Sequence, residues 1–334
     1  MSIAYPPSIP LARLPTPLHE CRNVADLLRP GQRLWVKRDD ETGCVTTGNK
    51  LRKLELYVAQ AQQQGADTLI TSGSALSNHC RATAIVARHV GMRAALLLHG
   101  PERPKLDGNF LLMILAGAII RAGSGSSIPA EAQLEDMAER LREQGRKPYI
   151  IPPAGSGKLG VISYVKAAEE LKSQVDEAGL RPGGVTVCYG SGSTYSGLLL
   201  GTRLHGINCP VVGLSISGDA AQCRSRTRDL IDRTMAFLGV EPCVADDEIE
   251  VLDGYRGEGY GKAPEDLYAF IHDIAQRTGL ILDPVYTGKA FWGTVQEMRA
   301  GCLQHAQDVV FVHTGGVFGI YQQKDGFKLD WQTV

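Results

Sequence analysis

Lys50 stands in the stretch TTGNKLRKLE (46–55), where a Thr-Thr-Gly-Asn turn leads into an apolar helical pattern. The pattern predicts a helix over residues 50–64, which stops at Gly65. A cation at the start of a helix opposes the helix dipole, so a solvated helix would more naturally carry Asp or Glu there. The position suits an amine that is neutral or joined to a carbonyl compound as an imine. Lys50 is therefore a candidate for covalent chemistry, the alternative being an ordinary solvated charge.

A turn rich in glycine and hydroxyl groups follows a buried-looking strand at residues 185–189. Its residues are Gly190, Ser191, Gly192, Ser193 and Thr194. Glycines let backbone N–H groups approach an oxyanion, and the helix predicted over residues 196–206 adds partial positive charge. The turn lacks the lysine of a nucleoside-triphosphate loop, and its glycine spacing is not that of a dinucleotide fingerprint. One monophosphate group fits it best, the alternative being a plain strand–helix connection.

Three consecutive polar residues open the helix predicted over residues 77–91, directly after a predicted strand at 66–73. They are Ser77, Asn78 and His79. One of them could serve only as the N-cap of the helix. Together, at a helix N-terminus, they could also hold a carboxylate.

Two further strand ends carry polar side chains. A strand is predicted to end at Asp283 in ILDPVYTGKA, and Tyr286 and Thr287 follow it. Both side chains could face a ligand, although a buried tyrosine with a satisfied hydroxyl is equally common. In FVHTGG, His313 and Thr314 precede two glycines. A lone histidine in such a place is more often structural than catalytic.

The elements that must position these residues alternate along the chain, with short aliphatic runs separated by amphipathic helical stretches. This alternation predicts parallel strands joined by right-handed crossovers, and hence an α/β fold with open, doubly wound sheets. Such sheets bind ligands beyond the carboxyl ends of their strands. The chain has 334 residues, enough for two packed units. The glycine-rich stretch at 152–160 is the best candidate for a chain return between two layers.

Composition excludes several other classes of protein. The sequence is 43% hydrophobic and 21% charged with a net charge of -1, so it does not suggest nucleic acid or an anionic membrane as a partner. The longest apolar run, LLMILAGAII, is too short to span a bilayer. The eight cysteines form no C-x-x-C pair and are too scattered for a metal site or a disulfide framework. We expect free thiols, no metal and a cytoplasmic protein.

A phosphate site, a carboxylate site and a lysine on a turn are the parts that pyridoxal 5'-phosphate needs. The stretches GNKLRKLE, SNHCR, GSGSTYSG and DPVYTGKA resemble, in this order, the motifs of fold-type II pyridoxal-phosphate enzymes. The branch they resemble is that of D-cysteine desulfhydrase and 1-aminocyclopropane-1-carboxylate deaminase, and the likeness runs from LPTPLHE to HTGG.

The resemblance implies a tryptophan synthase β-like architecture with two open, twisted, mainly parallel sheets flanked by helices. A large cofactor-binding domain would comprise residues 1–50 and 159–334. A small α/β domain, residues 51–158, would be inserted in it, with the active site in the cleft between the two. The family commonly forms homodimers, so a homodimer is expected.

Carried over by position, the resemblance also assigns residues to the cofactor. Lys50 would form the Schiff base, and Asn78 would hydrogen-bond the pyridoxal O3' oxygen. Residues 190–194 would hold the phosphate. Thr287, with Thr314 as a second candidate, would contact the pyridine nitrogen.

The substrate contacts implied by the resemblance come from the same motifs. Ser77, Asn78 and His79 would receive the carboxylate of a small amino acid. Tyr286 would face the substrate. Tyr260, in GYRGEGYGK, matches a second tyrosine near that pocket.

The implied activity is α,β-elimination from a β-substituted amino acid, giving pyruvate and ammonia, with Lys50 or Tyr286 removing the α-proton. The deaminase branch carries a glutamate where Thr287 stands, and a neutral hydroxyl leaves the ring nitrogen largely unprotonated, which favours elimination over ring opening. The alternatives are 1-aminocyclopropane-1-carboxylate deaminase, L-cysteate sulfo-lyase, β-replacement including a sulfhydrylase, and a non-catalytic protein that binds cofactor or amino acid.

Three positions depart from the family pattern. Leu76 stands where glutamine is usual, Thr47 where glycine is usual, and Tyr195 where histidine is expected. We expect Leu76 and Thr47 to border the substrate space, so that the substrate could differ from D-cysteine.

Overall fold

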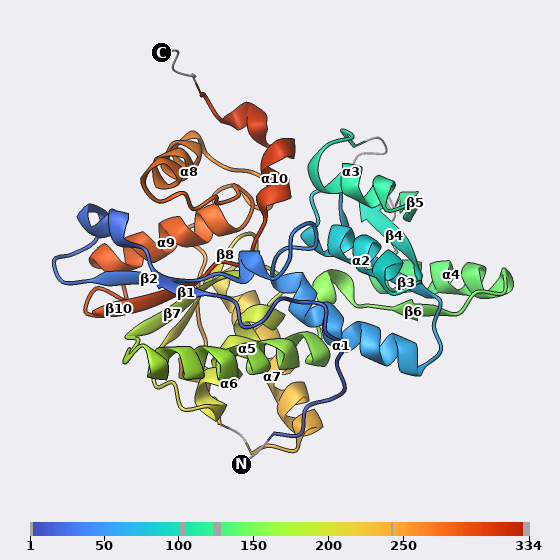
Figure 1. The fold of residues 1–334 in the computed structure, drawn as a ribbon, viewed down its shortest axis with the longest axis horizontal. Coiled ribbons are helices and arrows are strands. Elements are labelled where there is room, and N and C mark those ends of the chain that lie inside the picture. Colours follow the sequence, from blue (N-terminus) through green and yellow to red (C-terminus); the bar gives the residue numbers. More distant parts are fainter. Residues whose placement is uncertain (1–2, 101–103, 123–127, 242, 330–334) are drawn as a thin grey trace.

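The computed structural model describes residues 3–100, 104–122, 128–241 and 243–329, and its strands form two separate sheets (Figure 1). The strands are β1 (Leu18–Glu20), β2 (Arg33–Lys37), β3 (Thr68–Ser74), β4 (Arg93–His99), β5 (Ile119–Ala122), β6 (Pro148–Ile150), β7 (Gly184–Tyr189), β8 (Val211–Ser215), β9 (Glu250–Leu252) and β10 (Asp308–Val312). The α-helices are α1 (Asn49–Gln63), α2 (Asn78–His89), α3 (Gly108–Leu115), α4 (Ala130–Glu143), α5 (Lys158–Glu177), α6 (Ser193–Leu204), α7 (Ala220–Leu238), α8 (Glu265–Thr278), α9 (Thr287–Ala300) and α10 (Val317–Gln322). Short 3-10 segments are η1 (Arg22–Leu27), η2 (Asp39–Glu41), η3 (Pro153–Gly155), η4 (Asp246–Glu248) and η5 (Lys324–Gly326).

The larger sheet has six strands in the order β1-β2-β10-β7-β8-β9. All its neighbouring pairs are parallel except β1 and β2. Strands β7 and β10 are buried along their whole length. Helices α5, α6 and α7 contribute to the core on one face of this sheet, and α8 and α9 to the core on the other. Burial on both faces explains why these strands read as continuous apolar runs.

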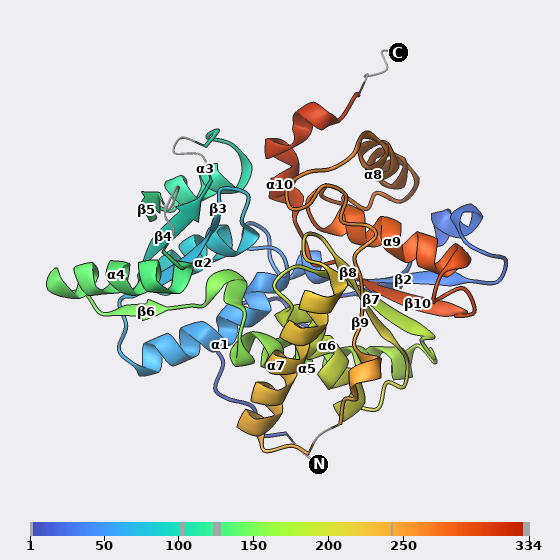
Figure 2. The ribbon, with the colours of Figure 1, turned by 180° about the vertical axis from the view of Figure 1, so that it is seen from behind.

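The smaller sheet has four parallel strands in the order β5-β4-β3-β6. Helices α1 and α2 share one core with it, and α4 packs against the other face. Seen from behind, the two sheets lie side by side, with α1 extending below the smaller one (Figure 2). All four strands fall between β2 and β7 in the sequence. The α/β class with two open, mainly parallel sheets is confirmed, whereas the domain boundaries near residues 50 and 159 stay a prediction.

One element of the sequence prediction is wrong. We expected a strand ending at Asp283, but residues 281–283 belong to no strand and residues 284–286 form a turn. Asp283 instead receives hydrogen bonds from the first residues of α9, so local side-chain capping replaces sheet pairing there. Separately, no helix in the described residues combines the length and apolarity needed to cross a lipid bilayer.

Candidate active site

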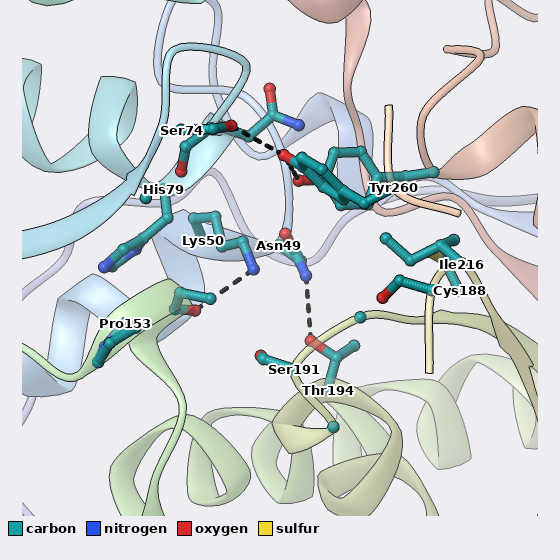
Figure 3. Close-up of a pocket in the computed structure, with 18 of the residues that line it drawn as sticks. Asn49, Lys50, Ser74, His79, Pro153, Cys188, Ser191, Thr194, Ile216 and Tyr260 are labelled. Atoms are coloured by element: carbon teal, nitrogen blue, oxygen red, sulfur yellow. Dashed lines mark hydrogen bonds between the residues drawn. The ribbon is translucent and has the colours of Figure 1, made fainter. Parts of the chain in front are cut away.

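A cavity of about 540 Å³ lies where strand ends of both sheets meet (Figure 3). Residues at or just after the carboxyl ends of β3, β4, β7, β8 and β10 line it, as expected for sheets whose ligands bind at that edge. The predicted site residues on its wall are Lys50, Ser77, Asn78, His79, Gly190, Ser191, Gly192, Thr194, Tyr260, Tyr286 and Thr314. Two predicted residues, Ser193 and Thr287, are fully buried behind the wall.

Lys50 reaches the cavity because the chain before it packs tightly against residues 314–315. Gly48 has φ +105°, and a Cβ there would lie 2.7 Å from the carbonyl oxygen of Thr314. The backbone N–H of Asn49 donates to that same oxygen at 3.1 Å. Only glycine allows this close approach. This close packing explains why glycine stands at position 48, two residues before Lys50, and it brings Thr314 to the cavity wall.

The Lys50 amine has a single described hydrogen-bond partner, the carbonyl oxygen of Ala154 at 3.3 Å. Burial lowers the pKa of Lys50 to about 8, because no carboxylate offsets the loss of hydration. A lysine whose amine is partly neutral near physiological pH can act as a nucleophile or a base.

A buried ionic cluster fixes the helix that carries Lys50. Arg52, two residues later, donates to both carboxylate oxygens of Asp39 at 2.8 and 2.9 Å. It also donates to both oxygens of Glu170, on α5, at 2.9 Å. Two bidentate contacts from a guanidinium leave α1 little freedom to rotate or slide.

The turn at residues 190–194 joins β7 to α6 and faces the cavity with backbone and hydroxyl groups. Gly192 has φ +96°, and a Cβ there would lie 2.8 Å from the hydroxyl oxygen of Tyr189. The side-chain amide of Asn49 donates to Thr194 Oγ1 at 3.0 Å. An open turn at the start of a twelve-residue helix has the backbone N–H groups and the helix dipole that favour an anion.

Lys53 places a buried amine behind this turn, and the sequence analysis assigned it no role. Its side chain is 1% exposed, and its Nζ atom donates to Ser193 Oγ at 2.7 Å. Burial, and then repulsion by Lys50, hold the pKa of Lys53 well below its usual value. Among the described residues no carboxylate forms an ion pair with it. The spacing of the two lysines could have pointed to Lys53, because a residue three positions after Lys50 lies on the same face of the helix.

The N-terminus of α2 is built from the predicted polar trio. Ser77 is the N-cap, and its hydroxyl oxygen accepts a hydrogen bond from the N–H of Cys80 at 3.2 Å. Asn78 Oδ1 accepts from the side chain of Asn109 at 3.1 Å. The Ser77 hydroxyl hydrogen and the Asn78 amide hydrogens therefore remain available to a ligand.

His79 lies on the same wall and is held neutral. Its Nε2 atom is 3.0 Å from Thr71 Oγ1, whereas its buried Nδ1 atom has no partner among the described residues. Burial, and repulsion by Lys50 and Lys53, lower the pKa of His79 well below its usual value. A neutral imidazole with one unused nitrogen can still bind a polar ligand.

Tyr260 and Tyr286 line the same cavity as Lys50, and Figure 3 shows Tyr260 across from Lys50. Their hydroxyl oxygens are 2.7 Å apart, and Tyr260 also contacts Ser74 Oγ at 3.2 Å. Burial is the largest cause that raises the pKa of both tyrosines. Both phenols therefore stay protonated near neutral pH.

Asp283 organises the turn that carries Tyr286 and Thr287. Its carboxylate accepts hydrogen bonds at 2.9 Å from the N–H groups of Val285, Tyr286 and Thr287. It also accepts from the Thr287 hydroxyl at 2.8 Å. Burial raises the pKa of Asp283 to about 6 despite these hydrogen bonds. The role of Thr287 at a ring nitrogen stays a prediction.

The three residues that depart from the family pattern do not share one location relative to the cavity. Tyr195 is on the cavity wall, whereas Leu76 and Thr47 are outside it. The backbone carbonyl of Thr47 accepts from Arg81 at 2.7 Å, so this residue supports the turn before α1. His313 has the structural role that is common for a lone histidine, with Nδ1 accepting from the N–H of Gly315 at 3.1 Å.

Comparisons with known proteins agree with this geometry. A family model described as pyridoxal-phosphate dependent enzyme matches residues 9–315. A putative 1-aminocyclopropane-1-carboxylate deaminase of Pyrococcus abyssi is 39% identical over 94% of this chain and 93% of the relative. The bifunctional D-cysteine desulfhydrase/1-aminocyclopropane-1-carboxylate deaminase of Arabidopsis thaliana mitochondria is 37% identical over 94% of this chain and 79% of the relative. A solved ACC deaminase homologue superposes with a TM-score of 0.87 at 35% identity, covering 96% of this chain and 95% of that one.

Proposed function

The chain belongs to the 1-aminocyclopropane-1-carboxylate deaminase and D-cysteine desulfhydrase family of pyridoxal-phosphate dependent enzymes, and on this premise we propose that it is an α,β-eliminating lyase. Its substrate would be a small β-substituted amino acid, converted to pyruvate and ammonia. The observation that carries the proposal is that Lys50 and the hydrogen-bonded Tyr260–Tyr286 pair line one cavity. A base and a proton donor in one cavity are what removal of an α-proton and loss of a β-substituent require.

The residues present fit the cofactor. The buried amine of Lys53, which forms no ion pair among the described residues, lies behind the glycine turn at the start of α6 and would be protonated when an anion binds there. A phosphate at residues 190–194 would supply the missing negative charge. Lys50 would join the aldehyde carbon. When bound in this way, pyridoxal phosphate supplies an electron sink for negative charge at the α-carbon of an amino acid.

The N-terminus of α2 would orient the substrate. Within the described part of the chain, no contact uses the hydroxyl hydrogen of Ser77 or the amide hydrogens of Asn78, so both groups could donate to a carboxylate. His79 would add a third polar contact. The helix dipole favours an anion at the same place.

Lys50 is the better candidate for the base that removes the α-proton. Its pKa is lowered to about 8, whereas the pKa of Tyr286 is raised well above its usual value. A phenol that stays protonated is suited to donate a proton to the departing β-substituent. We therefore assign proton removal to Lys50 and proton donation to Tyr286, with Tyr260 as its hydrogen-bond partner.

The neutral hydroxyl of Thr287 supports elimination over opening of a cyclopropane ring. Thr287 stands where the deaminase branch carries a glutamate, and its hydroxyl donates to Asp283, so this position offers no acidic group to a ring nitrogen. A less protonated ring is a weaker electron sink, which favours a reaction in which a leaving group takes the electrons.

An assay of several amino acids tests the proposal. D-Cysteine, L-cysteine, β-chloroalanine, cysteate and 1-aminocyclopropane-1-carboxylate would each be incubated with the cofactor-loaded protein, and pyruvate and 2-oxobutanoate would be measured. Pyruvate from at least one β-substituted alanine is expected. Formation of 2-oxobutanoate alone would overturn the proposal in favour of ring opening. A spectral change without product from every amino acid would indicate a binding protein.

Three expectations from the sequence accompany this function. We propose two domains with the cavity in the cleft between them, a homodimer, and a location in the cytoplasm. Sedimentation of the cofactor-loaded protein tests the dimer, and a single monomeric species would contradict it. Limited proteolysis tests the domain boundaries, and fractionation of cells tests the location.

A further inference from the structure

The loop between β9 and α8, residues 253–264, connects the two halves of the cavity wall. It carries Tyr260, whose hydroxyl contacts Ser74 at the end of β3 in the smaller sheet. A Cβ at Gly261 would lie 3.3 Å from the side chain of Leu76, in the turn after that strand. The same tyrosine contacts Tyr286 on the side of the larger sheet. The position of this loop therefore decides whether the two phenols meet.

One buried cation holds the loop. Lys289 is 2% exposed, and its Nζ atom donates to the backbone carbonyls of Arg256 and Gly259, each at 2.7 Å. No ion pair joins it to a carboxylate in the part of the chain that the structure describes. A buried ammonium needs such hydrogen bonds, because burial alone strongly disfavours its charge.

The anchor and one tyrosine share a helix. Lys289 is three residues after Tyr286, in the first turn of α9. Gly259 directly precedes Tyr260. The first turn of α9 thus places Tyr286 on the cavity wall and, through Lys289, binds the loop next to Tyr260.

We propose that Lys289 is a positioning residue which, through the carbonyls of Arg256 and Gly259, sets Tyr260 against Tyr286 and Ser74. The consequence for catalysis rests on the proposed function, in which the tyrosine pair donates a proton. The position of the loop does not depend on the proposed function, because it follows from the two hydrogen bonds that Lys289 donates.

The rate of trypsin cleavage after Arg256 measures how often the loop detaches from Lys289. The Arg256 carbonyl belongs to the scissile bond and also accepts from Lys289, so the bond is cleaved only when the loop detaches. In cofactor-loaded Lys289→Met, cleavage at this bond, followed by mass spectrometry, should be about tenfold faster or more. Lys262→Met is the matched control, because Lys262 is in the same loop with a side chain 66% exposed and should cleave at Arg256 at the wild-type rate. An unchanged rate in Lys289→Met would overturn the proposal.

Kinetics in a double-mutant cycle separate positioning from general stability. Lys289→Met should lower kcat by about 100-fold, with a smaller change in KM. In a Tyr260→Phe background the same substitution should lower kcat by no more than about twofold further, because its effect acts through Tyr260. Losses that simply multiply would overturn the proposal. If Lys289→Met does not fold, Lys289→Gln replaces it in both measurements.

Failure of the proposed function has a different signature. A wild-type protein that eliminates from none of the amino acids would contradict the lyase assignment. The trypsin experiment would still decide whether Lys289 holds the loop.

Discussion

The hydroxyl oxygens of Tyr260 and Tyr286 lie 2.7 Å apart, although Tyr260 is on a loop and Tyr286 is the N-cap of α9. Their rings are nearly perpendicular, at 73°, with centroids 5.6 Å apart. One hydroxyl donates to the other, and both stay protonated near neutral pH because the pKa of each is raised. In the proposed mechanism this pair supplies a proton to the cavity that Lys50 also lines.

Tyr286→Phe should lower kcat by about 100- to 10,000-fold for elimination, because the variant keeps the ring and loses the donated proton. Steady-state pyruvate formation measures this. Tyr321→Phe, on an exposed tyrosine of α10, is the control and should have wild-type activity. A Tyr286→Phe enzyme with full kcat on a substrate with a poor leaving group would refute the assigned role.

Lys50→Ala should abolish turnover and the visible absorbance that covalently bound cofactor gives. The reason is that the variant has no amine in the cavity to join the aldehyde carbon. Borohydride reduction followed by peptide mapping would find the cofactor on residue 50 of the wild type. A yellow, active variant would rule out Lys50 as the point of attachment.

The rate at which the apo-protein takes up pyridoxal phosphate should rise with pH through about 8 and then level off. The attacking species is the neutral amine, and the pKa of Lys50 is lowered to about 8 by burial. Stopped-flow absorbance at a series of pH values measures the profile. A midpoint near 10.5, the ordinary lysine value, would show that the amine is solvated in the apo-protein.

Lys53→Met should weaken cofactor binding by about 10- to 100-fold while leaving the apo-protein as stable as the wild type or more stable. Replacing a buried amine that forms no ion pair relieves a desolvation cost in the apo-protein, whereas in the loaded protein it deletes the group that would be protonated beside the phosphate. Equilibrium dialysis and urea unfolding measure the two effects. Lys105→Met, at an exposed lysine, is the control. Equal loss of affinity in both variants would contradict the assignment.

Asp283→Asn should change how stability depends on pH. The pKa of Asp283 in the folded protein is raised to about 6 from 3.8, so between these values the native state binds more protons than the unfolded state. The contribution of this group to the unfolding free energy therefore falls by up to about 3 kcal/mol as pH rises through that window. Urea unfolding of both apo-proteins should show this difference. Parallel pH profiles for wild type and variant would contradict it.

Local patterns in the sequence were enough to predict the fold class and several of the segments that line the cavity. The spacing of apolar residues along a strand or a helix shows which side chains are buried. Glycine marks turns whose backbone conformation other residues avoid. The segments around Lys50, Asn78 and Gly190 could be singled out for this reason. Asp283 was misread because a short apolar run before a turn reads as a strand, whereas its carboxylate caps α9.

The sequence by itself determined the alternation of strands and helices, the lysine at a helix start and the glycine turn, because each depends on neighbours within a few residues. Tertiary structure alone decided that Lys53 lies behind the turn at residues 190–194, that Lys289 binds two carbonyls of the loop of Tyr260, and that Thr287 is behind the cavity wall. These relations depend on which distant backbone carbonyl or hydroxyl comes within 3 Å of a side chain. Such distances are set by how the two sheets pack, and no local pattern specifies that packing.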